Sequence, residues 1–166
     1  SLFESPQDPS IEILGQTSTV LQEGLLQSVS ARPGGAEVIS VFPAWPKQWE
    51  ASFRLAARGG FLVTAAMRGG NVEFVEIESR RGETCRLRNP WGGPCVVGSV
   101  EGPRQVLDGE ILSFDTTLGK RYCVVPEDGR TSPRHRMALP SRTEPISYSW
   151  KAPNGRVVQG VLGRRE

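Results

Sequence analysis

Residues 52–79 read SFRLAARGGFLVTAAMRGGNVEFVEIES, and this stretch decides the fold class. Apolar side chains alternate with polar or small ones over three segments, which is the period of a β-strand. The breaks RGG and RGGN contain glycine and asparagine, which adopt the positive φ angles of tight turns. The alternation shifts phase at Phe74 and Val75, which predicts a β-bulge there. The stretch therefore predicts three consecutive strands joined by tight turns.

The same pattern continues on both sides of this stretch. EVISVF at residues 37–42 predicts a strand before it, and four further strand segments follow it: TCRLRN, CVVGSV, ILSFDTT and RYCVVP. Seven or eight short strands with a turn about every ten residues are typical of a β-sandwich. ISYSW and GRVVQGVLG can add one or two strands near the end, with PNG as their turn. The chain's 19 glycines and 13 prolines fit a fold with so many turns.

A helix is expected near the start, over residues 17–29 (TSTVLQEGLLQSV). Leu21, Leu25, Leu26 and Val29 recur at helical spacing, and the threonines and serine before them supply N-cap oxygens. So short a helix is marginal alone in water and needs a surface to pack against. The fold class expected is therefore mainly β: an antiparallel β-sandwich with one short N-terminal α-helix.

Composition excludes several kinds of partner and cofactor. The formal net charge is +2 and the basic residues are scattered among acids, so no nucleic-acid surface is predicted. No run of eighteen apolar residues exists, so we expect no membrane partner. The cysteines and the single His135 lack metal-ligand spacing, and no phosphate-binding loop is present, so we expect neither metal nor cofactor. The sequence starts at Ser1 rather than Met, which suggests a segment of a longer protein; no export signal, as a secreted or periplasmic parent would need, is visible in it.

Two cysteines have a spacing that allows two readings. Cys85 and Cys95 flank RLRNPWGGP symmetrically, and if that stretch is a hairpin loop they could form a disulfide across it. The alternative, which we favour, is a pair of small buried thiols. Cys123 is left over in either case.

The segment AEVISVFPAWPKQW holds the aromatic residues that are candidates for ligand binding. Trp45 and Trp49 lie among prolines and could stack on a sugar, or could pack one structural layer against another, which we favour. The remaining acid–base chemistry is expected from carboxylates, because the single histidine, His135, lies in a Pro/Arg-rich loop that does not favour a Ser-His-Asp or Cys-His arrangement. Glu12 stands out, since it lies between Ile11 and Ile13 just before the expected helix. In that position a carboxylate is most often an electrostatic partner of the helix amino end.

The order of several motifs resembles the end of glycoside hydrolase family 95 proteins. EGLLQSV, then ISVFPAWPKQWEASFRLAARGGFLVTA, then VEIESRRGETCRLRNPW look like that family's last barrel helix and the β-sandwich after it. The resemblance covers roughly residues 10–126, and DGEILSFDTTLGKRYCVVP is similar to the final sandwich strands. It implies three parts: residues 1–35 as the tail of an (α/α)6 catalytic barrel, 36–126 as the C-terminal sandwich, and 127–166 as a Pro/Arg-rich extension.

The resemblance also implies a function. Family members of this kind are inverting enzymes that act on α-L-fucosides or α-L-galactosides, and inversion uses two carboxyl groups with a water between base and sugar. Counting back without gaps from LLQS places Glu12 where the fucosidases have their base Asp, here in Ile-Glu-Ile-Leu rather than Ile-Asp-Gly-Asn. The acid would lie in the missing barrel, so this segment alone should be inactive. Phe42, Trp45 and Trp49 would then be interdomain packing, with Pro43 and Pro46 holding an extended crossing.

Two alternatives belong to other functional classes. One is an independent carbohydrate-binding module that uses Trp45, Trp49 or Trp91. The other is a structural or interaction domain whose helix face docks on a separate chain. The preferred reading is an accessory domain, with the barrel of the same parent chain as its partner and a glycan as a possible second one.

Overall fold

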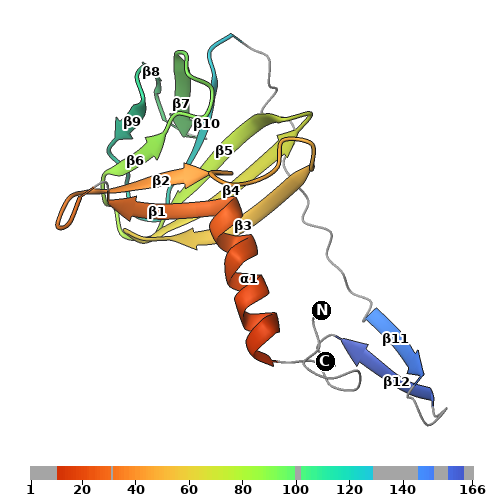
Figure 1. Ribbon diagram of the computed structural model, residues 1–166. Coiled ribbons are helices and arrows are strands. Elements are labelled where there is room, and N and C mark those ends of the chain that lie inside the picture. The colour runs from red at the N-terminus through yellow and green to blue at the C-terminus, as the bar shows by residue number, and fades with distance from the viewer. Residues whose placement is uncertain (1–10, 31, 100–101, 129–145, 152–156, 163–166) are drawn as a thin grey trace. The chain divides into compact units, whose positions relative to one another are not determined.

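The computed structural model describes residues 11–30, 32–99, 102–128, 146–151 and 157–162 (Figure 1). The chain divides into two compact units, one formed by residues 19–137 and the other by residues 1–18 with 138–166. Within the described residues, no helix has the length and apolar character needed to cross a bilayer.

The helix exists, but its expected bounds were wrong. Helix α1 spans Ile11–Leu25, and the chain passes directly into strand β1, Leu26–Ser30. β1 pairs antiparallel with β2, Glu37–Val41, from Leu26 opposite Val41 to Ser30 opposite Glu37. Pairing with β2, and not the helical spacing of the leucines, decides the structure of these residues. As a result Leu26 is buried on one side of the strand and Val29 is exposed on the other. The expected helix therefore ends at Leu25, and residues 26–30 of it are a strand.

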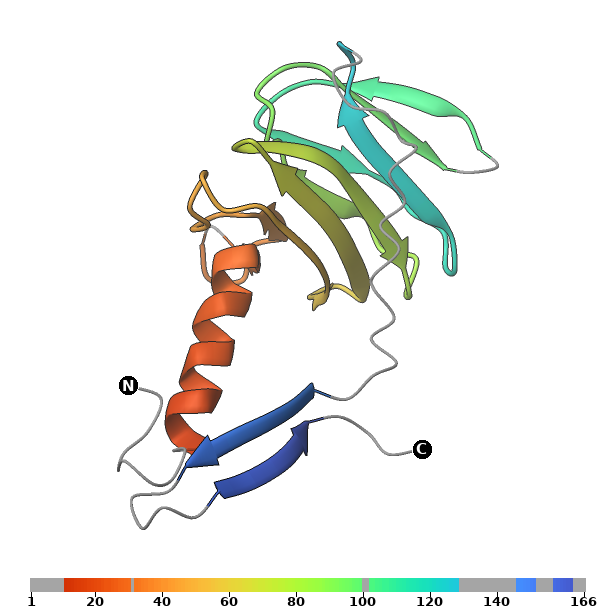
Figure 2. The ribbon, with the colours of Figure 1, turned by 90° about the vertical axis from the view of Figure 1, so that its right-hand side faces the viewer.

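Ten strands form two sheets, and Figure 2 shows them from the side. The four-stranded sheet has the order β1-β2-β6-β9, and the six-stranded sheet has the order β3-β4-β5-β10-β7-β8. The remaining bounds are β3 Ala51–Ala57, β4 Phe61–Arg68, β5 Asn71–Ser79, β6 Cys85–Arg88, β7 Cys95–Ser99, β8 Arg104–Leu107, β9 Ile111–Phe114 and β10 Arg121–Pro126. β8 was not expected from the sequence, because it is short and three of its four residues are exposed.

Apolar side chains from both sheets form one core. Ile39, Leu87 and Leu112 of the four-stranded sheet are almost fully buried in the same cluster as Val63 and Ile77 of the six-stranded sheet. Among the described strands the pairings are antiparallel except for β2 with β6, where Ile39 lies opposite Leu87 in parallel. The predicted mainly-β sandwich with one N-terminal helix is therefore confirmed.

The predicted bulge in β5 is also confirmed. Ala66 lies opposite Phe74 and Met67 lies opposite Val72, so Glu73 is an extra residue between two paired ones. The bulge shifts the alternation, so Val72 and Val75, three residues apart, both lie in the core cluster, whereas Phe74 is buried outside that cluster.

The disulfide alternative was wrong, and the prediction of buried thiols is confirmed. Cys85 lies on β6 and Cys95 on β7, which belong to different sheets, so the stretch between them crosses the sandwich instead of forming a hairpin. Both thiols are free and fully buried. Desolvation by burial raises the pKa of Cys85 to about 12 and that of Cys95 to about 11.

The second unit contains a separate two-stranded sheet. β11, Ile146–Lys151, pairs antiparallel with β12, Val157–Leu162, as the alternation in ISYSW and GRVVQGVLG predicted. The predicted PNG turn and most of the Pro/Arg-rich extension lie outside the described residues.

Candidate functional site

The chain leaves β2 through a strained residue. Phe42 has a φ of 53°, a left-handed conformation that costs a bulky residue on the order of 1–3 kcal/mol unless its surroundings hold it. Its N–H donates to the carbonyl of Leu25 at 2.7 Å, and the N–H of Ala44 donates to Gly24 at 3.4 Å. Its ring packs edge-on against Phe53, with centroids 5.2 Å apart. These contacts tie the loop after β2 to the C-terminal end of α1.

The prolines of FPAWP do not hold an extended crossing, contrary to expectation. The segment makes turns at residues 43–44 and 47–48, because its backbone bonds back to the helix end instead of running on to a new layer. Trp45 is half-buried, and a Cβ added at Gly24 would lie 3.5 Å from its ring. A methyl group at Gly24 would therefore make an ordinary van der Waals contact with the indole, although the glycine itself weakens the helix by propensity.

The two tryptophans of this segment lie together. Trp45 and Trp49 make an edge-to-face pair with centroids 5.8 Å apart, and Nε1 of Trp45 donates to the carbonyl of Trp49 at 3.1 Å. Trp49 is 55% exposed, whereas Trp45 faces a groove. The pairing orients the Trp45 ring, and the sugar-stacking role of either residue stays a prediction.

A groove of about 760 Å³ opens beside Trp45, and we call it the Trp91 groove. This volume lies within the range of small-molecule sites. Its walls come from the loop after β2, the β4–β5 hairpin, the loop before β7 and the end of β10. The lining residues are Val41, Phe42, Pro43, Trp45, Lys47, Met67, Arg68, Gly70, Asn71, Val72, Glu73, Pro90, Trp91, Pro126 and Asp128.

Trp91 is held in place by a hydrogen-bonded loop. Its Nε1 donates to the carbonyl of Val72 at 2.7 Å, so the indole is fixed against the bulged part of β5. The Asn89 side chain accepts from the N–H of Trp91 at 3.0 Å and of Gly92 at 3.2 Å. Its amide donates to Gly93 at 2.9 Å and to Gly109 at 3.0 Å. The asparagine therefore closes the NPWGGP loop and sets the direction of the tryptophan.

Glu73, the bulged residue of β5, lines the Trp91 groove. Its Oε2 is buried and has no hydrogen-bond partner among the described residues. Arg68 forms an ion pair with it, but the Nε–Oε2 distance of 3.6 Å is too long for a hydrogen bond. The sequence predicted the bulge, but nothing in it indicated that the extra residue is the carboxylate of a groove.

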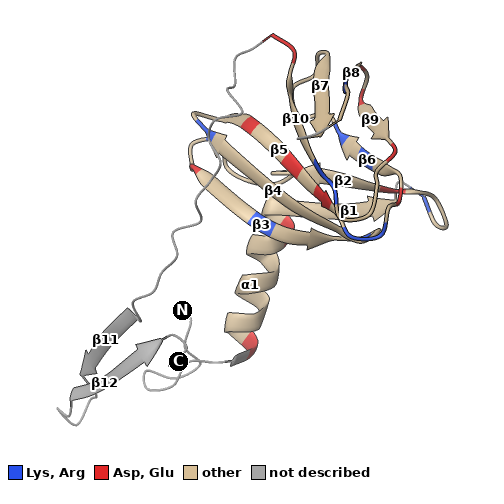
Figure 3. Ribbon diagram, turned by 180° about the vertical axis from the view of Figure 1, so that it is seen from behind, with Lys and Arg blue, Asp and Glu red and all other residues tan. Residues whose placement is uncertain are grey.

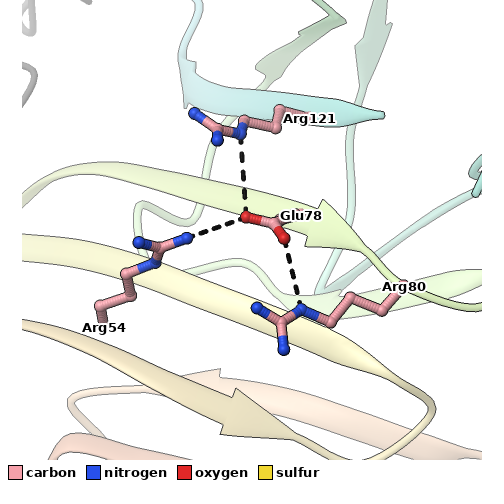
Figure 4. A network of polar contacts seen from close by, with 4 residues as sticks. All are labelled: Arg54, Glu78, Arg80 and Arg121. Carbon is pink, nitrogen blue, oxygen red and sulfur yellow. Dashed lines mark hydrogen bonds and ion pairs between the residues drawn. The ribbon is translucent and has the colours of Figure 1, made fainter. Parts of the chain in front are cut away.

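A second carboxylate, Glu78, contacts three arginine side chains (Figure 4). It contacts Arg54 at 3.0 Å, Arg80 at 3.3 Å and Arg121 at 3.8 Å. Partial burial raises the pKa of Glu78, but hydrogen bonds from Arg80 and Arg54 outweigh it, so its net pKa lies below the ordinary value. Figure 3 shows acidic residues along β5 with basic ones on neighbouring strands. The contacts of Glu78 are therefore structural ion pairs, and a carboxyl group with a lowered pKa is not suited to act as a catalytic acid.

Glu12 lies in the first turn of α1 and is exposed. It is inside the helix rather than before it, because α1 begins earlier than the sequence indicated. Its role as a general base stays a prediction. Among the described residues no group of three or more His, Cys, Asp or Glu side chains is arranged to hold a metal.

Comparison with known families gives a match over the sandwich. The family model described as "Glycoside hydrolase family 95, C-terminal domain" matches residues 34–124. No curated protein matches the chain. The matched stretch runs from the turn before β2 into β10, and it includes Phe42, Trp45, Glu73 and Trp91.

Proposed function

Because this chain belongs to glycoside hydrolase family 95, whose C-terminal domain it contains, we propose that its sandwich buttresses the catalytic barrel of its parent enzyme. The sandwich is an accessory domain of a glycoside hydrolase. In this proposal the chain up to Leu25 is the tail of the barrel, the sandwich begins with β1 and ends at residue 126, and residues 127–166 are an extension. The barrel of the same chain is the partner.

One observation carries the proposal: an apolar stripe on α1 continues beyond the sandwich core. Leu14, Leu21 and Leu25 follow each other at spacings of seven and four, which places them on one helix face. Leu25 packs against the core, whereas Leu21 is 45% and Leu14 is 44% exposed. The apolar face predicted from the sequence comprised Leu21, Leu25, Leu26 and Val29, but Leu26 and Val29 lie on β1. Burying a leucine fully is worth about 1.5–3 kcal/mol, so this stripe favours a packed neighbour.

The catalytic chemistry proposed for the parent is inverting hydrolysis of α-L-fucosides or related glycans. Its support is the family membership and the motif order around residues 10–61. Inversion needs two carboxyl groups about 6.5–9.5 Å apart. Glu12 is the candidate base, and the acid would come from the barrel, so residues 1–166 alone would not turn over substrate.

Two measurements test the proposal. Purified residues 1–166 are expected to leave an aryl α-L-fucoside and an aryl α-L-galactoside intact. Turnover of either would refute the proposal that the barrel must supply the catalytic acid.

The second measurement concerns the stripe. In the enzyme that contains this chain, Leu21→Glu should lower Tm, because a charge would enter the buttressed interface. In residues 1–166 alone the same change should stay within about 0.5 kcal/mol, since the side chain already meets water. Equal effects in both settings would refute the proposed packing.

A further inference from the structure

We propose that the Trp91 groove is a binding site for a neutral carbohydrate. The buttress role requires only the helix and the sandwich core. It does not account for a groove of about 760 Å³ with fixed aromatic rings and a buried carboxylate oxygen.

The charge of the lining favours a neutral ligand. Among the described lining residues, Lys47 and Arg68 supply two positive charges and Glu73 and Asp128 supply two negative ones, so their formal charges sum to zero. A polyanion or polycation would meet as much repulsion as attraction. Sugar hydroxyls both donate and accept hydrogen bonds, so they can use a carboxylate, a guanidinium and the Asn71 amide together.

The apolar part of the lining is rigid and aromatic. Phe42, Trp45 and Trp91 contribute rings, and each is held by a contact already described: the Phe53 ring, the Trp49 carbonyl and the Val72 carbonyl. Pro43, Pro90 and Pro126 add side chains with almost no conformational freedom. A pyranose has an apolar C–H face, which such a surface can cover at small entropic cost.

Glu73 supplies the polar anchor. The bulge places its carboxylate at the groove, and Oε2 lacks a hydrogen-bond donor among the described residues. Leaving a buried carboxylate oxygen unsatisfied is costly, and a ligand hydroxyl at this position would satisfy it with a charge-assisted hydrogen bond. The 3.6 Å ion pair leaves Arg68 free to turn its remaining N–H groups toward a neighbouring hydroxyl.

A proline-rich peptide is the main competing ligand, since aromatic grooves also bind polyproline helices. Such recognition uses ring faces and a few hydroxyl or indole donors. A polyproline helix offers few hydrogen-bond donors, because proline has no backbone N–H, so it would leave Oε2 of Glu73 without a hydrogen-bond partner. The sugar therefore accounts for more of the lining.

The test is calorimetry on residues 1–166 with methyl α-L-fucoside, methyl α-L-galactoside, methyl β-D-glucoside and a proline-rich decapeptide. At least one glycoside should bind saturably at millimolar concentration. Glu73→Gln should weaken that binding by at least about tenfold, because it removes the charge from the anchor. Glu76→Gln is the matched control on the same strand, outside the groove, and should leave binding unchanged.

The proposal is overturned by the absence of saturable heat from every glycoside, by binding of the peptide alone, or by equal weakening in both variants. If Glu73→Gln does not fold, Arg68→Gln at the exposed end of the same ion pair takes its place, with the same expected weakening. Failure here leaves the buttress proposal intact, since that proposal depends on the Leu21 comparison and on turnover.

Discussion

Replacement of Glu78 by glutamine tests whether the arginine cluster of Figure 4 stabilises the sandwich through charge. The carboxylate is shared by three arginines at 3.0, 3.3 and 3.8 Å. The arginine side chains are 42–59% exposed while Glu78 is 20% exposed, so solvent screens each pair. Exposed pairs contribute about 0.2–1 kcal/mol each, and the arginines repel one another, so we expect a net loss of about 1 kcal/mol.

The pH dependence has a definite sign. The pKa of Glu78 lies below its ordinary value of 4.5 in the folded chain. Its stabilising contribution is therefore fully present above about pH 4.5 and is lost as pH falls through the folded pKa. The wild-type chain and Glu78→Gln should differ in Tm by about 2–4 °C at neutral pH. The two should converge in acid.

Thermal unfolding followed by circular dichroism at several pH values and salt concentrations measures this. Glu76→Gln is the control, because it lies on the same strand and the described residues show no ion pair for it. High salt should reduce the Glu78→Gln difference. A difference that persists unchanged in acid or in high salt would refute an electrostatic origin.

Three further predictions concern stability and reactivity. Gly24→Ala should stabilise the chain by about 0.5–1 kcal/mol in urea unfolding, because it favours the helix while its Cβ meets Trp45 at an ordinary 3.5 Å; destabilisation would show that the helix end cannot accept a methyl group. Ser79→Ala should lower the free energy of unfolding by about 1–3 kcal/mol, because the buried Ser79 hydroxyl accepts a hydrogen bond from the Gly82 N–H at 3.0 Å and bonds the Thr116 hydroxyl at 2.7 Å. Ser52→Ala, at an exposed position, should change the free energy of unfolding little. Cys85, Cys95 and Cys123 should not react with a thiol reagent near pH 8 until the chain unfolds, because burial raises their pKa values to about 12, 11 and 11; rapid labelling of the folded chain would contradict this.

The strands of residues 52–79 could be predicted because their determinants are local. Alternation sets each strand, and Gly59, Gly60, Gly69 and Gly70 all have positive φ in the turns between them. The bulge was visible as two adjacent apolar residues. In contrast, LLQSV fits helical spacing and strand alternation equally well, and pairing with residues 37–41 decides the outcome.

The candidate site was less predictable, since it depends on how distant segments meet. Trp45 and Trp91 were recognised as candidates, but the shared groove requires loops from both sheets to lie together. The sequence left a disulfide between Cys85 and Cys95 open for the same reason, because the sheet to which β6 and β7 each belong is a non-local property. The left-handed Phe42 and the direction of Glu73 have no sequence signal, because both follow from contacts made only after folding.

The pairing of β1 with β2 has a practical consequence for any shortened form of the protein. The family match begins at residue 34, inside the connection between these strands, so a chain cut there would lose β1 entirely. β2 would then become an edge strand with unpaired backbone groups beside Val38, Ile39 and Val41, which are buried in the intact chain. Such an edge is a template for intermolecular pairing, so a fragment trimmed to the matched boundary should aggregate where one that begins before α1 stays dispersed.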